Sequence, residues 1–234
     1  MGNIIATFSD KLKKLDGDMK AKASVIKLNT KRQLTPGEIA MSRLVFKDAI
    51  DYSKVWIHIG GMIHTKTGNA MTPAGEMYLP KDDYIQNPDF SAAKGNAQHW
   101  FIHEMVHVWQ YQMGVSNGWL GLKQLCKGGY TSQVNSADSG SNELKAYDTD
   151  ITGRDLNKKF SDFNFEQQGR IIELWFDACY LQNNFPTRPH HQKSLKLLGY
   201  VERILRDFLH KIGGKVWMIV FKNLRDLEMK WIGV

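Results

Sequence analysis

The sequence of 234 residues has only two cysteines and no long hydrophobic run. Two cysteines do not build a disulfide framework, and the absence of a CxxC pair excludes a thiolate zinc site. Cys126 and Cys179 are therefore expected to be buried thiols. The longest apolar run, residues 216–221, is far shorter than the roughly 20 residues that a membrane helix needs, so we expect no transmembrane segment.

The beginning of the sequence lacks the basic stretch and apolar core of a secretory signal. We therefore expect synthesis in the cytoplasm without a signal peptide. The 31 basic and 24 acidic residues give a net charge of +7, which suits an anionic partner such as nucleic acid, a lipid surface or a cell wall. Because many lysines cluster near the start, much of this charge is expected on one solvated face, and no specific nucleic-acid binding is predicted.

Length and composition predict one globular domain, residues 35–234, preceded by a polar extension, residues 1–34. The extension has apolar residues at helical spacing between residues 4 and 15. A helix is predicted from Thr35, which can form a capping box with Glu38, to about Ile50. Strands are predicted at 53–59 and 75–79, and a loop at 81–95.

Helices dominate the rest of the chain, so the predicted fold class is α+β and mainly helical. One helix is predicted at 96–113 and another at 164–181, where Asn164 and Gln167 can form a capping box. Between them, residues 114–142 read as loops with one short helix at 120–126. A long amphipathic helix is predicted at 194–210, and the tail from residue 216 as a short strand or final helix.

One motif carries recognisable chemistry: residues 103–107 read His-Glu-Met-Val-His, the pattern HExxH. Residues four apart share a face of an α-helix, so His103 and His107 can bind one metal ion together. Glu104 projects beside them, where it can take a proton from a metal-activated water and later deliver it to a leaving amine. Zinc is the predicted ion, because two imidazoles, a carboxylate and an open position suit Zn²⁺.

A catalytic zinc site needs a third protein ligand. His99 lies too far along the helix axis to share the ion, so we expect it in an outer position or at the surface. No third histidine follows at the metzincin spacing. A glutamate from a later segment remains, and the candidates are Glu143, Glu166 and Glu173. Glu166 is preferred because it opens a strongly apolar helix, and Glu173, two turns later on the same face, is the alternative.

The stretch 101–110, Phe-Ile-His-Glu-Met-Val-His-Val-Trp-Gln, resembles bacterial zinc metallopeptidases found beside type VI secretion spike proteins and Rhs-type toxins. The resemblance extends to residues 34–38, 46–52 and 164–168. HExxH alone is common to many peptidases, whereas its combination with Val-Trp-Gln and Glu-Gln-Gln is more particular. The resemblance implies a gluzincin-like site with His103, His107 and Glu166 as ligands and Glu104 as base. It also implies a zincin-like domain with a small N-terminal sheet packed on the HExxH helix.

The HExxH motif predicts zinc-dependent peptide hydrolysis, and the resemblance implies a secreted bacterial protein that acts as an antibacterial effector. Its substrate is expected to be peptidoglycan peptides or a target-cell protein. The family association implies export by a secretion machine to a target-cell periplasm, with a spike protein and an immunity protein as partners. The alternative is a docking or binding module of a secretion system that holds a metal without turnover, in which Glu104 has no obvious purpose.

Further side chains are candidates for supporting roles. Donors to the reaction oxyanion are sought among Tyr147, Arg170, His190, His191 and Tyr200. Asp148 or Asp150 can hold a ligand imidazole. Gln110 and Tyr111 are expected near the opening of the site, and the edge of strand 75–79 can pair with an extended peptide. Most tryptophans are expected in the core, and a second metal site at His58 and His64 is not expected.

Overall fold

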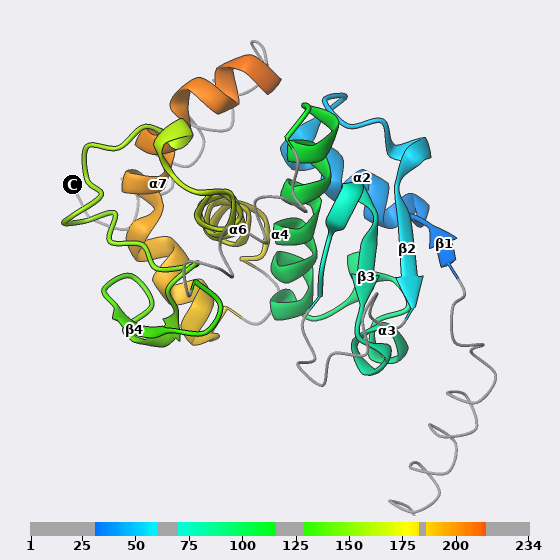
Figure 1. Cartoon of the computed structure of the whole chain (residues 1–234), viewed down its shortest axis with the longest axis horizontal. Coiled ribbons are helices and arrows are strands. Elements are labelled where there is room, and N and C mark those ends of the chain that lie inside the picture. Colours follow the sequence, from blue (N-terminus) through cyan, green and yellow to red (C-terminus); the bar gives the residue numbers. More distant parts are fainter. Residues whose placement is uncertain (1–30, 60–69, 116–128, 183–185, 214–234) are drawn as a thin grey trace, which may run out of the picture.

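The computed structural model describes residues 31–59, 70–115, 129–182 and 186–213, which form a mixed α+β fold that is mainly helical (Figure 1). Predictions for the N-terminal helix, the helix at 120–126, the tail, Cys126 and His64 fall outside these residues. The main elements, in chain order, are β1 (Lys31–Gln33), α2 (Pro36–Phe46), β2 (Trp56–Ile59), β3 (Met77–Leu79), α3 (Lys81–Gln86), α4 (Gly95–Gln112), β4 (Gln133–Ser136), β5 (Ser141–Leu144), α6 (Phe165–Tyr180) and α7 (Pro189–Gly213).

The three-stranded sheet has the order β1-β2-β3. Strand β1 pairs antiparallel with β2, and β2 pairs parallel with β3. Strand β1 lies inside the stretch that the sequence assigns to the polar extension. The strand predicted at 53–59 begins only at Trp56, because residues 52–54 form a 3-10 turn that the Asp51 side chain caps. Likewise, a 3-10 turn over Pro73–Gly75 precedes β3.

The outer edge of β3 is covered at its middle residue. Tyr78 exchanges two backbone hydrogen bonds with Met71, at 2.8 and 3.1 Å. The backbone groups of Tyr78 are therefore already paired. The prediction that this edge of the strand is available to an extended peptide is wrong at this residue.

Helix α2 begins where the sequence predicts. The Thr35 hydroxyl accepts a hydrogen bond from the Glu38 backbone N–H, and the Glu38 carboxylate accepts one from the Thr35 N–H. The helix ends at Phe46 rather than near residue 50, because Lys47 leaves the helical region with φ of 50°.

The prediction of a loop over residues 81–95 is wrong, because this stretch contains α3 and a 3-10 turn at Phe90–Ala92. The start of α3 has Pro80 at its N-cap and Asp82 and Asp83 in its first turn, where acidic side chains interact favourably with the helix dipole. The Asp89 side chain accepts from the Ser91 N–H and caps the 3-10 turn. These are local signals, but they lie in a polar stretch without helical periodicity.

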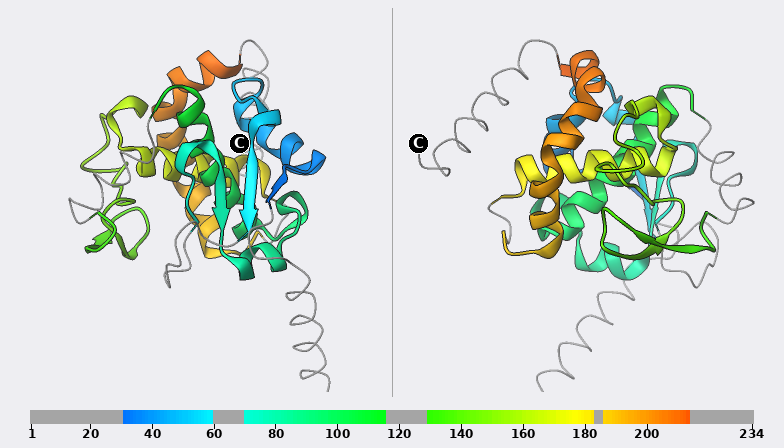
Figure 2. Two further views of the ribbon diagram at one scale, coloured as in Figure 1. Left: turned by 45° about the vertical axis from the view of Figure 1, so that its right-hand side comes forward. Right: turned by 90° about the vertical axis from the view of Figure 1, so that its left-hand side faces the viewer.

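Helix α4 lies in the middle of the molecule, between the three-stranded sheet and α6 (Figures 1 and 2). Five of its apolar side chains are fully buried and share one core with Ile57, Met77 and Leu79 of the sheet: Phe101, Ile102, Met105, Val106 and Val108. Helix α6 packs between α4 and α7. Among the described residues, no helix is both long and apolar enough to cross a lipid bilayer.

Helix α6 begins with the predicted capping box between Asn164 and Gln167. Helix α7 begins at Pro189, five residues before its predicted start, in agreement with the preference of proline for the first turn of a helix. Strands β4 and β5 form a hairpin whose turn places Gly140 at φ of 62°. The hairpin overlaps the stretch predicted as loops and was not recognised there, because its strands are polar.

The expectations for buried residues hold in part. Trp175 is buried, and Trp100 and Trp109 pack against the core. Trp56 is half-buried on the sheet, with the Lys31 ammonium 4.5 Å from its ring centre. The Cys179 thiol is free and half-buried, and burial raises its pKa.

Candidate metal centre

The HExxH motif lies on the part of α4 that faces α6, and the two helices approach closely there. Gly169 of α6 makes this approach possible. A Cβ atom at that position would stand 2.6 Å from Cε1 of His103, which is far inside van der Waals contact. The absence of a side chain at residue 169 therefore leaves the space that the His103 imidazole occupies.

Three donor groups converge between the helices. The Oε2 atom of Glu166, in the first turn of α6, lies 3.1 Å from Nε2 of His103 and 3.2 Å from Nε2 of His107. The two imidazole rings are 5.0 Å apart between centres and nearly perpendicular. All three residues are 5–6% exposed. One carboxylate oxygen thus faces two imidazole nitrogens in a buried position.

The electrostatics of this group favour a positive charge between the three side chains. Burial opposes protonation of His103, but hydrogen bonds to Glu166 and Glu173 outweigh it and raise the pKa of His103 to about 10. Burial likewise opposes ionisation of Glu166, but the neighbouring imidazoles hold its pKa well below the usual range. A proton and a metal ion compete for the same nitrogen, so a site that attracts one also attracts the other.

The donor set fits Zn²⁺. Ligands about 2.1 Å from a tetrahedral zinc ion lie about 3.4 Å from each other, and the Glu166 oxygen is 3.1 and 3.2 Å from the two imidazole nitrogens. Among the described residues, this group offers three protein donors, His103, His107 and Glu166. Three protein ligands are typical of catalytic zinc sites, whereas structural sites usually have four.

The second nitrogen of His103 is held by a charged pair. Its Nδ1 lies 3.0 Å from Oε2 of Glu173, the residue considered as an alternative third ligand. Arg170 donates to the other oxygen of Glu173 at 2.7 Å. Glu173 therefore lies on the side of the ring away from Glu166, where a carboxylate fixes the orientation of a ligand imidazole.

The second nitrogen of His107 is held by a neutral side chain. Its Nδ1 lies 2.9 Å from Oε1 of Gln110, and the Gln110 amide nitrogen donates to the Phe165 carbonyl and to Gln168 Oε1. Gln110 is 2% exposed, so its predicted place near the opening of the site is wrong. Its side chain instead ties the end of the motif to the start of α6.

Glu104 is also buried, and its carboxylate has a defined partner. The Thr72 hydroxyl donates to Oε2 of Glu104 at 2.5 Å. Thr72 precedes the 3-10 turn that leads into β3, so the segment beside the sheet fixes one oxygen of the predicted base. Sequence reasoning missed this contact, because an isolated threonine 32 residues before Glu104 has no recognisable spacing.

Two tyrosines complete the surroundings of the three donors. The Tyr130 hydroxyl donates to Oε1 of Glu166 at 2.5 Å, and the Tyr147 ring centre lies 5.8 Å from that of His103. Burial, reinforced by the negative charge of Glu166, raises the pKa of both phenols, which therefore stay protonated and can donate. Tyr147 was one of the predicted oxyanion donors, whereas Tyr130 was missed, because nothing in its local sequence distinguishes it.

The other predicted supporting residues lie elsewhere. Glu143 faces Arg170 at 3.7 Å, and Asp148 pairs with Arg154 at 2.8 Å. Asp150 accepts from the Arg154 backbone N–H, so both aspartates contact Arg154, and the role of holding a ligand imidazole falls to Glu173 instead. These groups stabilise the segment between β5 and α6.

Three more residues that the sequence suggested for the site make contacts outside the group of three donors. Tyr200 and Tyr111 are both exposed, and the Tyr111 ring packs against Gly75. His58 stacks on Tyr78 of the sheet and lies 2.5 Å from Glu76 Oε2. The remaining candidates, His190 and His191, belong to a group around Asp177 that also includes His99.

Comparison with known proteins finds the same relative in sequence and in structure. No family profile matches the chain. It is 32% identical over 146 residues to the type VI secretion system spike protein VgrG2b of Pseudomonas aeruginosa, a match that covers 62% of this chain and 13% of that protein. The solved effector domain of VgrG2b superposes with a TM-score of 0.51 and 26% identity, over 79% of this chain and 93% of that domain. The chain is homologous to this effector domain.

Homology to the effector domain is consistent with the predicted relation to type VI secretion spike proteins. The sequence match covers a small part of the spike protein, and the structural match covers nearly the whole of the solved effector domain. The relation is therefore to the effector part of that protein.

Proposed function

We propose that this protein is a zinc-dependent metallopeptidase that acts as a type VI secretion effector. The observation that supports the enzyme most strongly is the position of Glu166, whose Oε2 lies 3.1 and 3.2 Å from Nε2 of both histidines of the HExxH motif. This arrangement supports a zincin-like, gluzincin-type site with His103, His107 and Glu166 as ligands. A bound zinc ion there would lower the pKa of a water molecule and polarise a peptide carbonyl.

The residues around the ligands divide the remaining tasks. Glu104 is the general base and then the general acid: it accepts a proton from the attacking water and gives it to the leaving amine. Because Thr72 donates to Oε2 of Glu104, Oε1 is the oxygen that exchanges the proton. Glu173 and Gln110 hold the two imidazoles in place from their other nitrogens.

Tyr147 is the proposed donor to the oxyanion. Both neighbouring phenols are protonated, but the Tyr130 hydroxyl already donates to Glu166. Tyr130 therefore binds Oε1 of Glu166 and leaves Oε2 of that carboxylate facing the two imidazoles. Tyr147 lies next to the His103 ring and also interacts with Glu166, and we propose that its protonated hydroxyl turns to developing negative charge on the substrate carbonyl.

The effector role is proposed from the relation to VgrG2b, which is described as a type VI spike protein with an effector domain. We propose export by the secretion machine to a target-cell periplasm, together with a spike protein, and protection of the producer by an immunity protein. Peptidoglycan peptides are the preferred substrate, because a net charge of +7 suits an anionic wall polymer. A target-cell protein is the second substrate class.

The test of the proposed enzyme uses the full chain loaded with Zn²⁺ and compares it with Glu104→Gln. Both are incubated with purified peptidoglycan and with a peptide library, and new peptide ends are identified by mass spectrometry. We expect cleavage by the wild type and a loss of about 100-fold or more in Glu104→Gln, since general acid–base catalysis contributes 10²–10⁴-fold. In Glu104→Gln, the HExxH centre is expected to keep its one zinc ion.

Glu76→Gln is the matched control, because Glu76 lies near the sheet and pairs with His58 rather than with the HExxH residues. It should cleave like the wild type. A zinc-loaded wild type that leaves every substrate intact would favour a non-catalytic binding module of a secretion system.

A further inference from the structure

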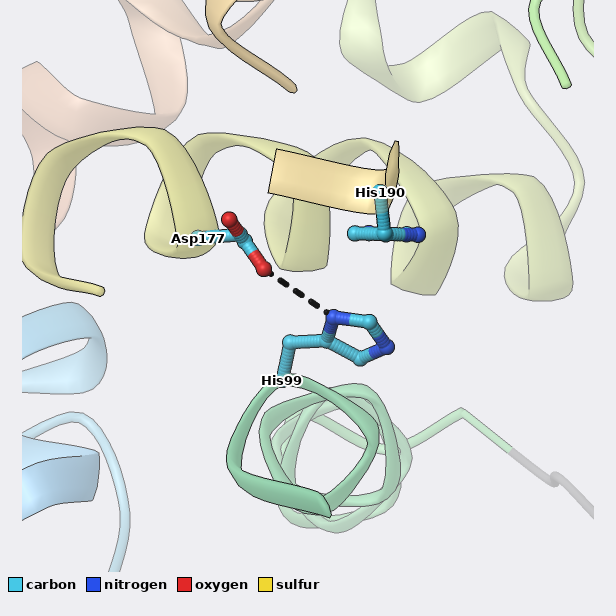
Figure 3. A group of neighbouring side chains, drawn as sticks. All are labelled: His99, Asp177 and His190. Carbon is cyan, nitrogen blue, oxygen red and sulfur yellow. Dashed lines mark hydrogen bonds and ion pairs between the residues drawn. The ribbon is translucent and has the colours of Figure 1, made fainter. Parts of the chain in front are cut away.

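A second group of imidazoles and a carboxylate lies one turn before the HExxH motif in the same helix interface. It consists of His99 of α4, Asp177 of α6 and His190 in the first turn of α7, which point toward one another in Figure 3. One donor atom from each residue lies within 4.8 Å of the other two. His99 Nδ1 is 3.2 Å from Asp177 Oδ2, and the two imidazole rings are 3.9 Å apart between centres.

We propose that His99, Asp177 and His190 bind a second divalent transition-metal ion of the Zn²⁺ class. Two imidazoles and one carboxylate form a donor set that such ions prefer over Mg²⁺ or Ca²⁺, which take oxygen ligands. Nε2 of His190 is buried and has no hydrogen-bond partner among the described residues. A buried polar atom without a partner is unfavourable, and a bound ion would satisfy it.

The carboxylate of this group is already oriented by a neighbouring histidine. His191 Nδ1 lies 2.5 Å from Oδ1 of Asp177, and Asp177 is fully buried. His99 approaches the other oxygen, Oδ2. The contact with His191 therefore holds Asp177 with Oδ2 turned toward His99, as a carboxylate ligand requires.

An arginine competes with the ion for the same oxygen. Nη2 of Arg188 lies 2.9 Å from Oδ2 of Asp177, and its Nη1 donates to Asn96 at 2.8 Å. Because the guanidinium is always charged, it repels a cation and lowers the affinity of the group for one. The second ion therefore binds more weakly than an ion at His103 and His107, and removal of the Arg188 charge strengthens its binding.

The two ions are expected to bind independently. His99 and His103 are four residues apart on one helix, about 6 Å along its axis. Glu173 of α6 contacts His103, and Asp177, four residues later on α6, contacts His99. No ligand is shared, so loss of one ion leaves the other site intact. The second ion would join α4, α6 and α7, and its binding should raise the melting temperature.

The experiment counts zinc ions in the chelator-treated full chain after dialysis against Zn²⁺, using elemental analysis and a competing chromogenic chelator. Two ions are expected in the wild type, one in His190→Ala, one in Glu166→Ala and none in the double variant. His210→Ala, which removes an exposed histidine near the end of α7, should keep two. In the Glu166→Ala background, added Zn²⁺ should still raise the melting temperature.

Arg188→Gln sharpens the test, because the second ion should bind about tenfold or more tightly when the competing charge is gone. Melting curves check that this variant and His190→Ala fold, and His99→Gln serves as a second variant at the same site. Two ions in a folded His190→Ala or His99→Gln protein would overturn the second site. One ion in the wild type, lost in Glu166→Ala and kept in His190→Ala, would overturn it while leaving the HExxH centre in place.

Discussion

The interface between α4 and α6 contains two groups with the same donor types in different electrostatic surroundings. At the HExxH end, the Glu166 carboxylate faces two imidazole nitrogens and a tyrosine hydroxyl. At the other end, the Asp177 carboxylate faces two imidazoles and the Arg188 guanidinium. A carboxylate beside an arginine is expected to bind a cation more weakly than one that only imidazoles and a phenol surround.

The position of Arg170 supports this distinction. It pairs with Glu173, which in turn holds Nδ1 of His103. The Arg170 guanidinium thus contacts Glu173 and none of the three donor residues. It fixes the residue that orients an imidazole without competing for the Glu166 oxygen.

The largest expected effect comes from Glu166→Ala. Removing this carboxylate takes away one of three ligands, so zinc affinity at the HExxH centre should fall by more than the roughly 10²-fold that loss of an outer contact can cost. Competition with a chelator measures the change. Glu76→Ala removes a glutamate near the sheet and should bind zinc like the wild type. Unchanged affinity in Glu166→Ala would transfer the third-ligand role to another residue.

A smaller effect is expected from Glu173→Gln, which keeps the shape of the side chain but removes the charge behind His103 and leaves Arg170 without its nearest anion. Zinc affinity should fall by about 10-fold, within the range known for residues that orient ligand imidazoles. Glu143→Gln is the control, because Glu143 contacts Arg170 but neither histidine of the motif. A loss in Glu173→Gln as large as in Glu166→Ala would indicate that Glu173 is itself a ligand.

The close approach of the helices is tested by Gly169→Ala. The added methyl group would overlap the His103 ring, and such overpacking typically costs about 1–3 kcal/mol of stability. Displacement of the ring should also weaken zinc binding by several-fold, which calorimetry and chelator competition can measure. Gly199→Ala on α7 is the matched control, since a Cβ there meets no atom within 4 Å. Equal behaviour of the two variants would contradict a tight fit at His103.

The smallest effect concerns a charged group outside both clusters. Burial opposes ionisation of Asp155, but hydrogen bonds from Arg154 and Lys158 outweigh it and lower its pKa. Because the folded pKa lies below the unfolded value of about 3.9, the ionised group stabilises the fold above that value and this stability is lost as pH falls. The stability difference between wild type and Asp155→Asn should therefore shrink from about pH 5 downward, as denaturant unfolding measures. A difference that does not change with pH would contradict this.

The sequence predicts the parts of the fold that local signals determine. The capping boxes at Thr35 and Asn164 are confirmed, because both depend on residues three positions apart. The helix that carries HExxH is also confirmed, because its apolar pattern is strong. That His99 does not share the donor group of His103 also follows from helix geometry alone, whereas its place beside Asp177 and His190 does not.

The contacts that orient the donors were not predictable from sequence. The roles of Thr72, Gln110 and Tyr130 depend on segments that come together only in the folded chain. Gln110 illustrates the difficulty, since its place one turn after the motif gave no indication that it faces α6. The polar hairpin of β4 and β5 was missed because polar strands lack the alternation that identifies a strand.

The most direct test of the account is the anomalous diffraction of a zinc-loaded crystal at the zinc absorption edge. The account predicts a strong peak bonded to Nε2 of His103, Nε2 of His107 and a carboxylate oxygen of Glu166, with the fourth position left to solvent. A peak bonded to four protein side chains, or no peak between these three residues, would contradict a catalytic zinc centre.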